Sequence, residues 1–217
     1  MGAIIASLMK NIFLVLLAFV LGFGSAVGYQ YFHSKQQKPT VTPEEPAFSL
    51  VPPSQAVSGI LTIINGRVEK FSRGDTEFKE ASTGAKILLG ESLTTKAQSS
   101  ATAAVSDIVT INMGPMAELV FANLFSNNFV LQQKSGKLMY QVDKPISIRV
   151  LHTLVSINSG DVTINIMGTD ASITVKTGIV KFALVDTDNN TKVWNLKPNE
   201  RANIDDKTRM VRLIQAR

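Results

Sequence analysis

The sequence ILTIINGRVEKF, residues 60–71, indicates the structural class of this chain. Two runs rich in β-branched and apolar residues, 60–64 and 67–71, flank Asn65 and Gly66. An Asn-Gly pair between two such runs is a strong signal of a β-hairpin, because both turn residues must accept a positive φ. The sequence therefore predicts a hairpin that turns at Gly66.

The same pattern of short strand-like runs continues to the C-terminus. β-Branched residues dominate each run, and the breaks between runs fall at Gly, Asn, Asp, Ser or Pro. Short strands at such even spacing are typical of sandwiches, jelly rolls and short β-solenoids. We therefore expect an all-β fold of this kind. The further strands are expected at 101–105, 108–112, 118–122, 129–133, 137–142, 146–151, 153–157, 162–166, 172–176, 179–185, 192–196, 202–204 and 210–214.

One stretch within this pattern resembles a known family. Residues 81–95, ASTGAKILLGESLTT, are similar to the FecR-domain motif of a glycine, a hydrophobic residue, and then Gly-acidic-x-hydrophobic-x-Thr. The resemblance extends over about residues 60–204 and implies an extracytoplasmic all-β module of the bacterial envelope, without specifying its ligand. Supporting matches lie at 66–68, 100–103, 109–119, 131–142, 177–180 and 196–200. Turns with positive φ are expected at Gly66, Gly84, Gly90, Gly136 and Gly178, which includes a hairpin turn at Gly136.

An uncharged apolar run, IFLVLLAFVLGFGSAVGYQYF at residues 12–32, precedes the strands. An α-helix needs about 20 such residues to cross the hydrocarbon core of a bilayer. The alternatives are a signal peptide cleaved after Ala26 and a buried core helix. However, the run is longer than the hydrophobic region of a signal peptide, and it ends in Tyr29, Tyr31 and Phe32, aromatic residues of the kind found at a membrane interface. We therefore expect one transmembrane helix. The spacing of Gly24 and Gly28 also leaves a homodimer through this helix open.

The chain divides into four segments on this reading. A cytoplasmic stub (1–11) and the transmembrane helix (12–32) are followed by a proline-rich linker (33–57) and a FecR-like β domain (58–217). Long C-terminal domains translocate largely regardless of charge, so the β domain is expected outside the cytoplasm of a single-pass cell-membrane protein. The expected stub is too short to fold, so the sigma-factor-binding region of FecR-type signalling proteins is not expected here.

Composition narrows the function classes. The chain has 217 residues, a net charge of +5 and no cysteine, which excludes disulfides and thiolate chemistry. The basic residues show no clustered patch with interleaved aromatics, so a nucleic-acid partner is not expected.

No catalytic, cofactor-binding or metal-binding motif is recognisable, and we expect neither an enzyme nor a cofactor. His152 has no partner specified by sequence, so it is expected to be a surface or strand histidine. Residues 186–190, DTDNN, begin like a calcium loop but lack its later glycine and glutamate, which favours a hairpin turn.

The most apolar loop-like region contains Phe121, Phe125 and Phe129, and the single tryptophan is Trp194. If exposed, these four residues would form a partner-binding patch; the alternative is that they pack in the core.

The leading hypothesis is a membrane-anchored FecR-like protein whose β domain binds, scaffolds or senses an envelope protein or a cell-wall component. The alternative is a membrane-anchored β jelly roll that carries lipid between its sheets during envelope lipid transport. The first requires a binding surface on the domain, whereas the second requires an apolar trough inside it.

Overall fold

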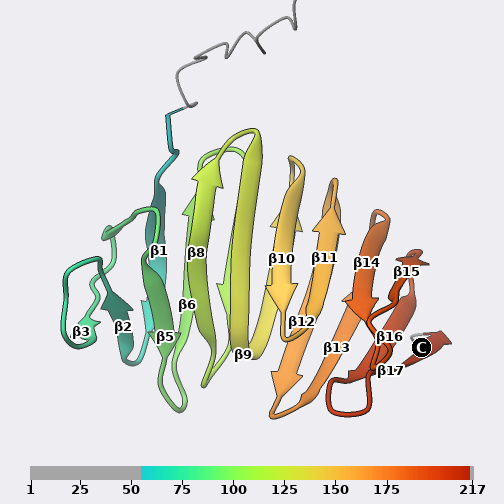
Figure 1. The fold of residues 1–217 in the computed structure, drawn as a ribbon. Coiled ribbons are helices and arrows are strands. Elements are labelled where there is room, and N and C mark those ends of the chain that lie inside the picture. Colours follow the sequence, from blue (N-terminus) through green and yellow to red (C-terminus); the bar gives the residue numbers. More distant parts are fainter. Residues whose placement is uncertain (1–54, 216–217) are drawn as a thin grey trace, which may run out of the picture. The chain divides into compact units, whose positions relative to one another are not determined.

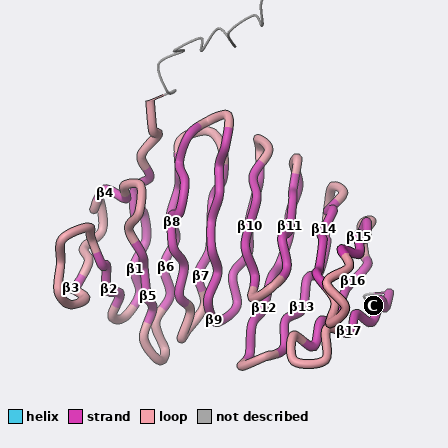
Figure 2. Tube along the Cα trace, viewed as in Figure 1, coloured by secondary structure: helices cyan, strands magenta, loops and turns pink. Residues whose placement is uncertain are grey.

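Buried and more exposed side chains alternate along most of the longer strands of the computed structural model, which describes residues 55–215. Every regular element in this part is a β-strand, so the expected all-β fold is confirmed (Figure 1, Figure 2). Within residues 55–215 there is no helix long and apolar enough to cross a bilayer. The expected stub, transmembrane helix and all but the last residues of the linker lie outside the described residues.

The strands form two sheets, each with a side that faces a common core. Sheet A contains, in order across the sheet, β3 (Lys79–Glu80), β2 (Val68–Phe71), β5 (Ser92–Thr95), β8 (Glu118–Phe125), the first half of β9 (Asn128–Val142), β10 (Ile146–Val150), β11 (Thr153–Ile157), β14 (Val180–Val185) and β15 (Thr191–Leu196). Sheet B contains β4 (Lys86–Ile87), β1 (Gly59–Asn65), β6 (Ser100–Val105), β7 (Val109–Met113), the second half of β9, β12 (Gly160–Met167), β13 (Asp170–Val175), β16 (Glu200–Asp205) and β17 (Met210–Gln215).

The long strand β9 belongs to both sheets. Its residues 128–135 pair in sheet A, and its residues 136–142 pair in sheet B. The strand changes sheets at Gly136, where φ is +80°, and a Cβ added there would lie 2.5 Å from the Cα of Ala117. The predicted hairpin at Gly136 is therefore wrong, since the two predicted strands are one continuous strand that bends.

The predicted hairpin at Gly66 is wrong for a related reason. β1 pairs with β6 in sheet B, whereas β2 pairs with β5 in sheet A, so Gly66 turns the chain from one sheet to the other. The backbone N–H of Arg67 donates to Ser99 Oγ at 2.9 Å and holds this corner against the turn before β6. Gly66 does have a positive φ, as do Gly84, Gly90 and Gly178.

After β9 the chain places successive hairpins in alternate sheets. The hairpin β10–β11 lies in sheet A, β12–β13 in sheet B, β14–β15 in sheet A and β16–β17 in sheet B. Each later hairpin pairs with the previous one of its own sheet, through β11–β14 and β13–β16. Figure 1 accordingly shows early strands such as β2 and β3 at one end of the domain and β15, β16 and β17 at the other.

The space between the sheets is filled by apolar side chains, with one polar network at the crossing of β9. The Tyr140 hydroxyl donates to Gln133 Oε1 at 3.0 Å. Gln133 Nε2 donates to the carbonyl oxygens of Gly136 at 2.8 Å and Ile164 at 3.1 Å. Gln133 is only 1% exposed, and burial raises the pKa of Tyr140 well above its usual value, so the phenol remains a donor. The network therefore ties sheet A, the bend and sheet B together.

The crossing at Gly136 predicts a large effect of one added methyl group. Gly136→Ala incurs the cost of positive φ, about 1–2 kcal/mol, together with the overlap with the Ala117 backbone. Gly168→Ala is the matched control, because Gly168 also has positive φ (+63°) but open space around it. Urea unfolding should show a loss for Gly136→Ala that exceeds the control by at least about 1–2 kcal/mol. Equal losses would contradict the close approach at the crossing.

Candidate functional site

The outer face of sheet B carries a continuous row of polar side chains across five strands. Residues directly opposite in antiparallel strands point to the same side of a sheet, so the strand register defines the row. With strands roughly 4.8 Å apart, the row is about 19 Å long. This middle row consists of Lys137, Asn165, Ser172, Asn203 and Arg212.

Two further rows flank the middle row on the same face, two residues away along each strand. The three rows together are called here the sheet-B face. The upper row consists of Thr102, Asn112, Met139, Thr163, Thr174, Arg201 and Ile214. The lower row consists of Met167, Asp170, Asp205 and Met210.

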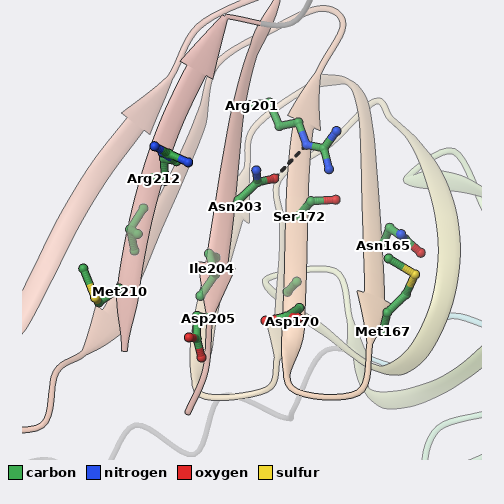
Figure 3. Close-up of a pocket in the computed structure, with 12 residues that line it drawn as sticks. Asn165, Met167, Asp170, Ser172, Arg201, Asn203, Ile204, Asp205, Met210 and Arg212 are labelled. Atoms are coloured by element: carbon green, nitrogen blue, oxygen red, sulfur yellow. Dashed lines mark hydrogen bonds between the residues drawn. The ribbon is translucent and has the colours of Figure 1, made fainter. Parts of the chain in front are cut away.

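The sheet-B face is hollowed in three places. The main hollow, about 560 Å³, lies over β12, β13, β16 and β17 and is lined by members of all three rows (Figure 3). Two smaller hollows of about 330 and 280 Å³ lie over β6, β7, β9 and β12, and both include Asn112 and Met139. The depressions on this face are lined by amides, hydroxyls and charged groups together with apolar side chains such as those of Met139, Met167 and Met210.

The cations of the main hollow have no acidic partner among the described residues. Arg201 Nε donates to Asn203 Oδ1 at 2.8 Å, the bond drawn in Figure 3, and its remaining nitrogens have no hydrogen-bond partner in this part of the chain. Arg212 forms no ion pair within residues 55–215, although it lies opposite Asn203. Two guanidinium groups on adjacent strands are thus available to a ligand.

The two carboxylates of the main hollow differ in the hydrogen bonds that they accept. Asp205 Oδ1 accepts the N–H groups of Lys207 and Thr208 at 2.9 and 3.1 Å in the β16–β17 turn. Hydrogen bonds from the side chain and backbone of Thr208 lower the pKa of Asp205, which keeps it ionised. Asp170 lies opposite Asp205, and its carboxylate has no hydrogen-bond partner among the described residues. The lower edge of the hollow is therefore negative.

Two nearly buried carboxylates outside this face, those of Glu69 and Glu91, serve the structure of the domain. Glu91 accepts bonds from Lys70 Nζ, from Ser72 Oγ and from the N–H of Leu88. Glu69 pairs with Lys96 at 2.7 Å, and the hydrogen bond from Lys96 lowers its pKa. Both carboxylates are nearly buried and fully engaged, and no group of three metal-ligating side chains occurs within residues 55–215.

His152 has a partner that its position in sequence does not reveal. Its Nδ1 lies 2.8 Å from Asp206 Oδ2, and its backbone N–H donates to Asp206 Oδ1 at 3.2 Å. Arg209 lies 3.7 Å from the same carboxylate. The contact joins the β10–β11 turn to the β16–β17 turn. It presents no nucleophile, so we interpret it as a structural link between the two turns.

The Asp186 segment forms the expected turn between β14 and β15. The Asp186 carboxylate accepts the N–H groups of Asn190 and Asp188 and pairs with Lys192 at 3.0 Å. The backbone hydrogen bond from Asn190, followed by that from the Lys192 side chain, lowers the pKa of Asp186. This carboxylate is thus occupied within its own turn.

The partner patch suggested for the aromatic residues does not form as one surface. Phe121 and Phe129 are buried in the core, because β8 and the first half of β9 turn these side chains between the sheets. Phe125 is partly exposed at the end of β8. Trp194, on β15, stacks on Phe182 with ring centroids 5.1 Å apart, and it is partly buried against the core. The exposed polar and charged groups of the sheet-B face, by contrast, lie side by side in the rows described above.

Comparisons with known proteins give a likeness of fold. No protein-family model matches the chain, and no curated protein matches it. Two crystal structures of a proposed anti-sigma factor from Parabacteroides distasonis ATCC 8503 are similar to it, each with a TM-score of 0.51 and 13% sequence identity. Each match covers 58% of this chain and 59% of the other. The shared feature is the fold alone.

The sheet-B face predicts a pattern of methionine oxidation. Met167 and Met210 are each 69% exposed on the face, whereas Met113, on the inner side of β7, is 1% exposed. Dilute peroxide should therefore oxidise Met167 and Met210 readily and leave Met113 intact, as peptide mass spectrometry can measure. Rapid oxidation of Met113 in the folded chain would contradict the assignment of inner and outer faces.

Proposed function

We propose that this chain is a membrane-anchored, extracytoplasmic FecR-like module of the bacterial envelope that acts by binding. The proposal joins three supports: the expected transmembrane helix at residues 12–32, the motif at residues 81–95, and a fold like that of the proposed anti-sigma factor. Such a module can act by scaffolding or by sensing, and both actions require a surface that binds a partner.

The sheet-B face is the observation that carries the proposal. Its rows run across adjacent strands, its hollows are open to solvent, and its cations lack acidic partners among the described residues. Nothing in the packing of the domain requires these side chains, because the core lies on the opposite side of sheet B. Polar groups set out on a rigid sheet without an internal role are suited to recognition.

The alternative, a lipid carrier, is less well supported. Lipid transport between the sheets requires an apolar trough, whereas Leu61, Phe121, Leu131, Ile164 and Phe182 are packed in that space at 0–1% exposure. The three hollows described above lie on the outside of sheet B. The lipid-carrier hypothesis also predicts that lipid co-purifies in stoichiometric amount, which lipid extraction and mass spectrometry would detect.

Cysteine labelling tests the location on which the binding role depends. The chain has no cysteine, and Ser58 is exposed just before β1, so Ser58→Cys provides a single reporter. A membrane-impermeant maleimide added to intact spheroplasts should label Ser58→Cys within minutes.

Ala6→Cys, in the expected cytoplasmic stub, is the matched control and should react only after lysis. Labelling of Ser58→Cys only after lysis would overturn the proposal that the β domain lies outside the cytoplasm.

A further inference from the structure

We propose that the sheet-B face binds a linear acidic polysaccharide that runs across the strands along the middle row. The inference rests on the proposed function and names the ligand class of the same face. Its anionic groups would engage Arg201 and Arg212 at one end of the row and Lys137 at the other.

The charge of the face supports an anionic ligand. Arg201 and Arg212 stand on the adjacent strands β16 and β17, and Asn203 lies beside both, opposite Arg212 and two residues from Arg201. Within residues 55–215 neither guanidinium has an acidic partner, and Lys137 likewise forms no ion pair there. Guanidinium groups bind carboxylates and phosphates through paired hydrogen bonds, so each of these two groups can hold one anionic group of the ligand.

The neutral centre of the middle row supports a glycan. Asn165, Ser172 and Asn203 each carry both a donor and an acceptor, as sugar hydroxyls do. They recur once per strand, about 4.8 Å apart, and a pyranose ring in an extended chain advances by a similar distance. One side chain would therefore meet each successive sugar, over roughly four sugars between Lys137 and Arg212.

The lower row limits the charge density of the ligand. Asp170 and Asp205 form a negative edge parallel to the middle row, and the low pKa of Asp205 keeps it ionised. A polymer with a charge on every face, such as a nucleic acid, would be repelled by that edge. A uronate glycan carries a single charge on each sugar, so a chain along the middle row can turn the carboxylates nearest β16 and β17 toward Arg201 and Arg212, away from the two aspartates.

A protein partner is less well matched to this face. Protein interfaces are enriched in aromatic residues, methionine and arginine and depleted in serine and aspartate, and their binding hot spots favour tryptophan, tyrosine and arginine. No aromatic residue lines the main hollow, and the lining is dominated by asparagine, serine, aspartate, arginine and methionine. The same absence of stacking platforms disfavours single-stranded nucleic acid.

The test uses the full-length chain in nanodiscs of neutral lipid, with polygalacturonate oligomers as the acidic probe and dextran oligomers as the neutral one. Isothermal titration should detect binding of polygalacturonate and none of dextran. The Arg201→Gln/Arg212→Gln double variant should weaken polygalacturonate binding by about tenfold or more, the loss expected for two charge-assisted contacts. Lys181→Gln/Arg149→Gln, which removes two charges from the outer side of sheet A, is the matched control and should stay within about twofold of the parent.

Methionine footprinting gives a second readout that does not depend on a variant. Bound polygalacturonate should slow the oxidation of Met167 and Met210, which border the row, while Met116 lies outside the lining of the three hollows and should oxidise at its free rate. Equal binding of dextran, equal losses in both double variants, or unchanged oxidation of Met167 and Met210 would each overturn the inference.

The two proposals fail separately. If Ser58→Cys is labelled from outside but polygalacturonate does not bind, the envelope module stands and the ligand class is wrong. If Ser58→Cys is protected, the envelope location is wrong whatever the titration shows.

Discussion

The hydrogen bonds of Gln133 at the crossing of β9 are the contacts on which the rest of this fold depends. One amide group donates to carbonyl oxygens of Gly136 and Ile164 and accepts from Tyr140, in an interior with few other polar side chains. A buried polar group left without a partner costs about 1–3 kcal/mol, so these bonds favour one geometry of the bend over its alternatives. The apolar core supplies the bulk of the stability, and the network specifies where β9 changes sheets.

The crossing also determines what the sheet-B face presents. Lys137 follows Gly136 immediately and pairs with Asn165, so the position of the bend sets which β9 residue opens the middle row. Side chains alternate between the two faces of a sheet, and a slip of one residue would exchange every inward and outward side chain. The pairings of β12 with β13, of β13 with β16 and of β16 with β17 then extend this register across the rest of the sheet. The face is a consequence of the same alternation that fills the core.

The local structure was largely predictable from the sequence, but the partition into sheets was not. Alternation of apolar and polar residues placed most of the strands, and the Gly corners at positions 66, 84, 90 and 178 do have positive φ. The errors at Gly66 and Gly136 share one cause. A positive φ permits a tight hairpin, a corner between sheets or a bend within a strand, and neighbouring residues do not distinguish them. Contacts with residues distant in sequence determine which of the three forms. Ser99 accepts a hydrogen bond from the backbone at the Gly66 corner, and Ala117 lies in close contact with Gly136.

The candidate site was hidden from the sequence for a similar reason. The alternation of Thr163 with Asn165, and of Arg201 with Asn203, marks one polar face on each strand. Which strands lie side by side, and in what register, depends on contacts between residues far apart in sequence, such as Asp170 and Asp205, beyond the reach of local patterns. For Phe121 and Phe129 the alternative of core packing is confirmed, because both side chains lie between the sheets.

The central claim, that β9 joins the two sheets into one unit, is most directly tested by native-state hydrogen exchange along β9. We predict that the protected amides of residues 128–135 and of residues 136–142 exchange with one free energy of opening, equal to that of global unfolding, and with the same dependence on urea. Exchange of one half of β9 at a distinctly lower free energy, while the other half stays protected, would contradict it.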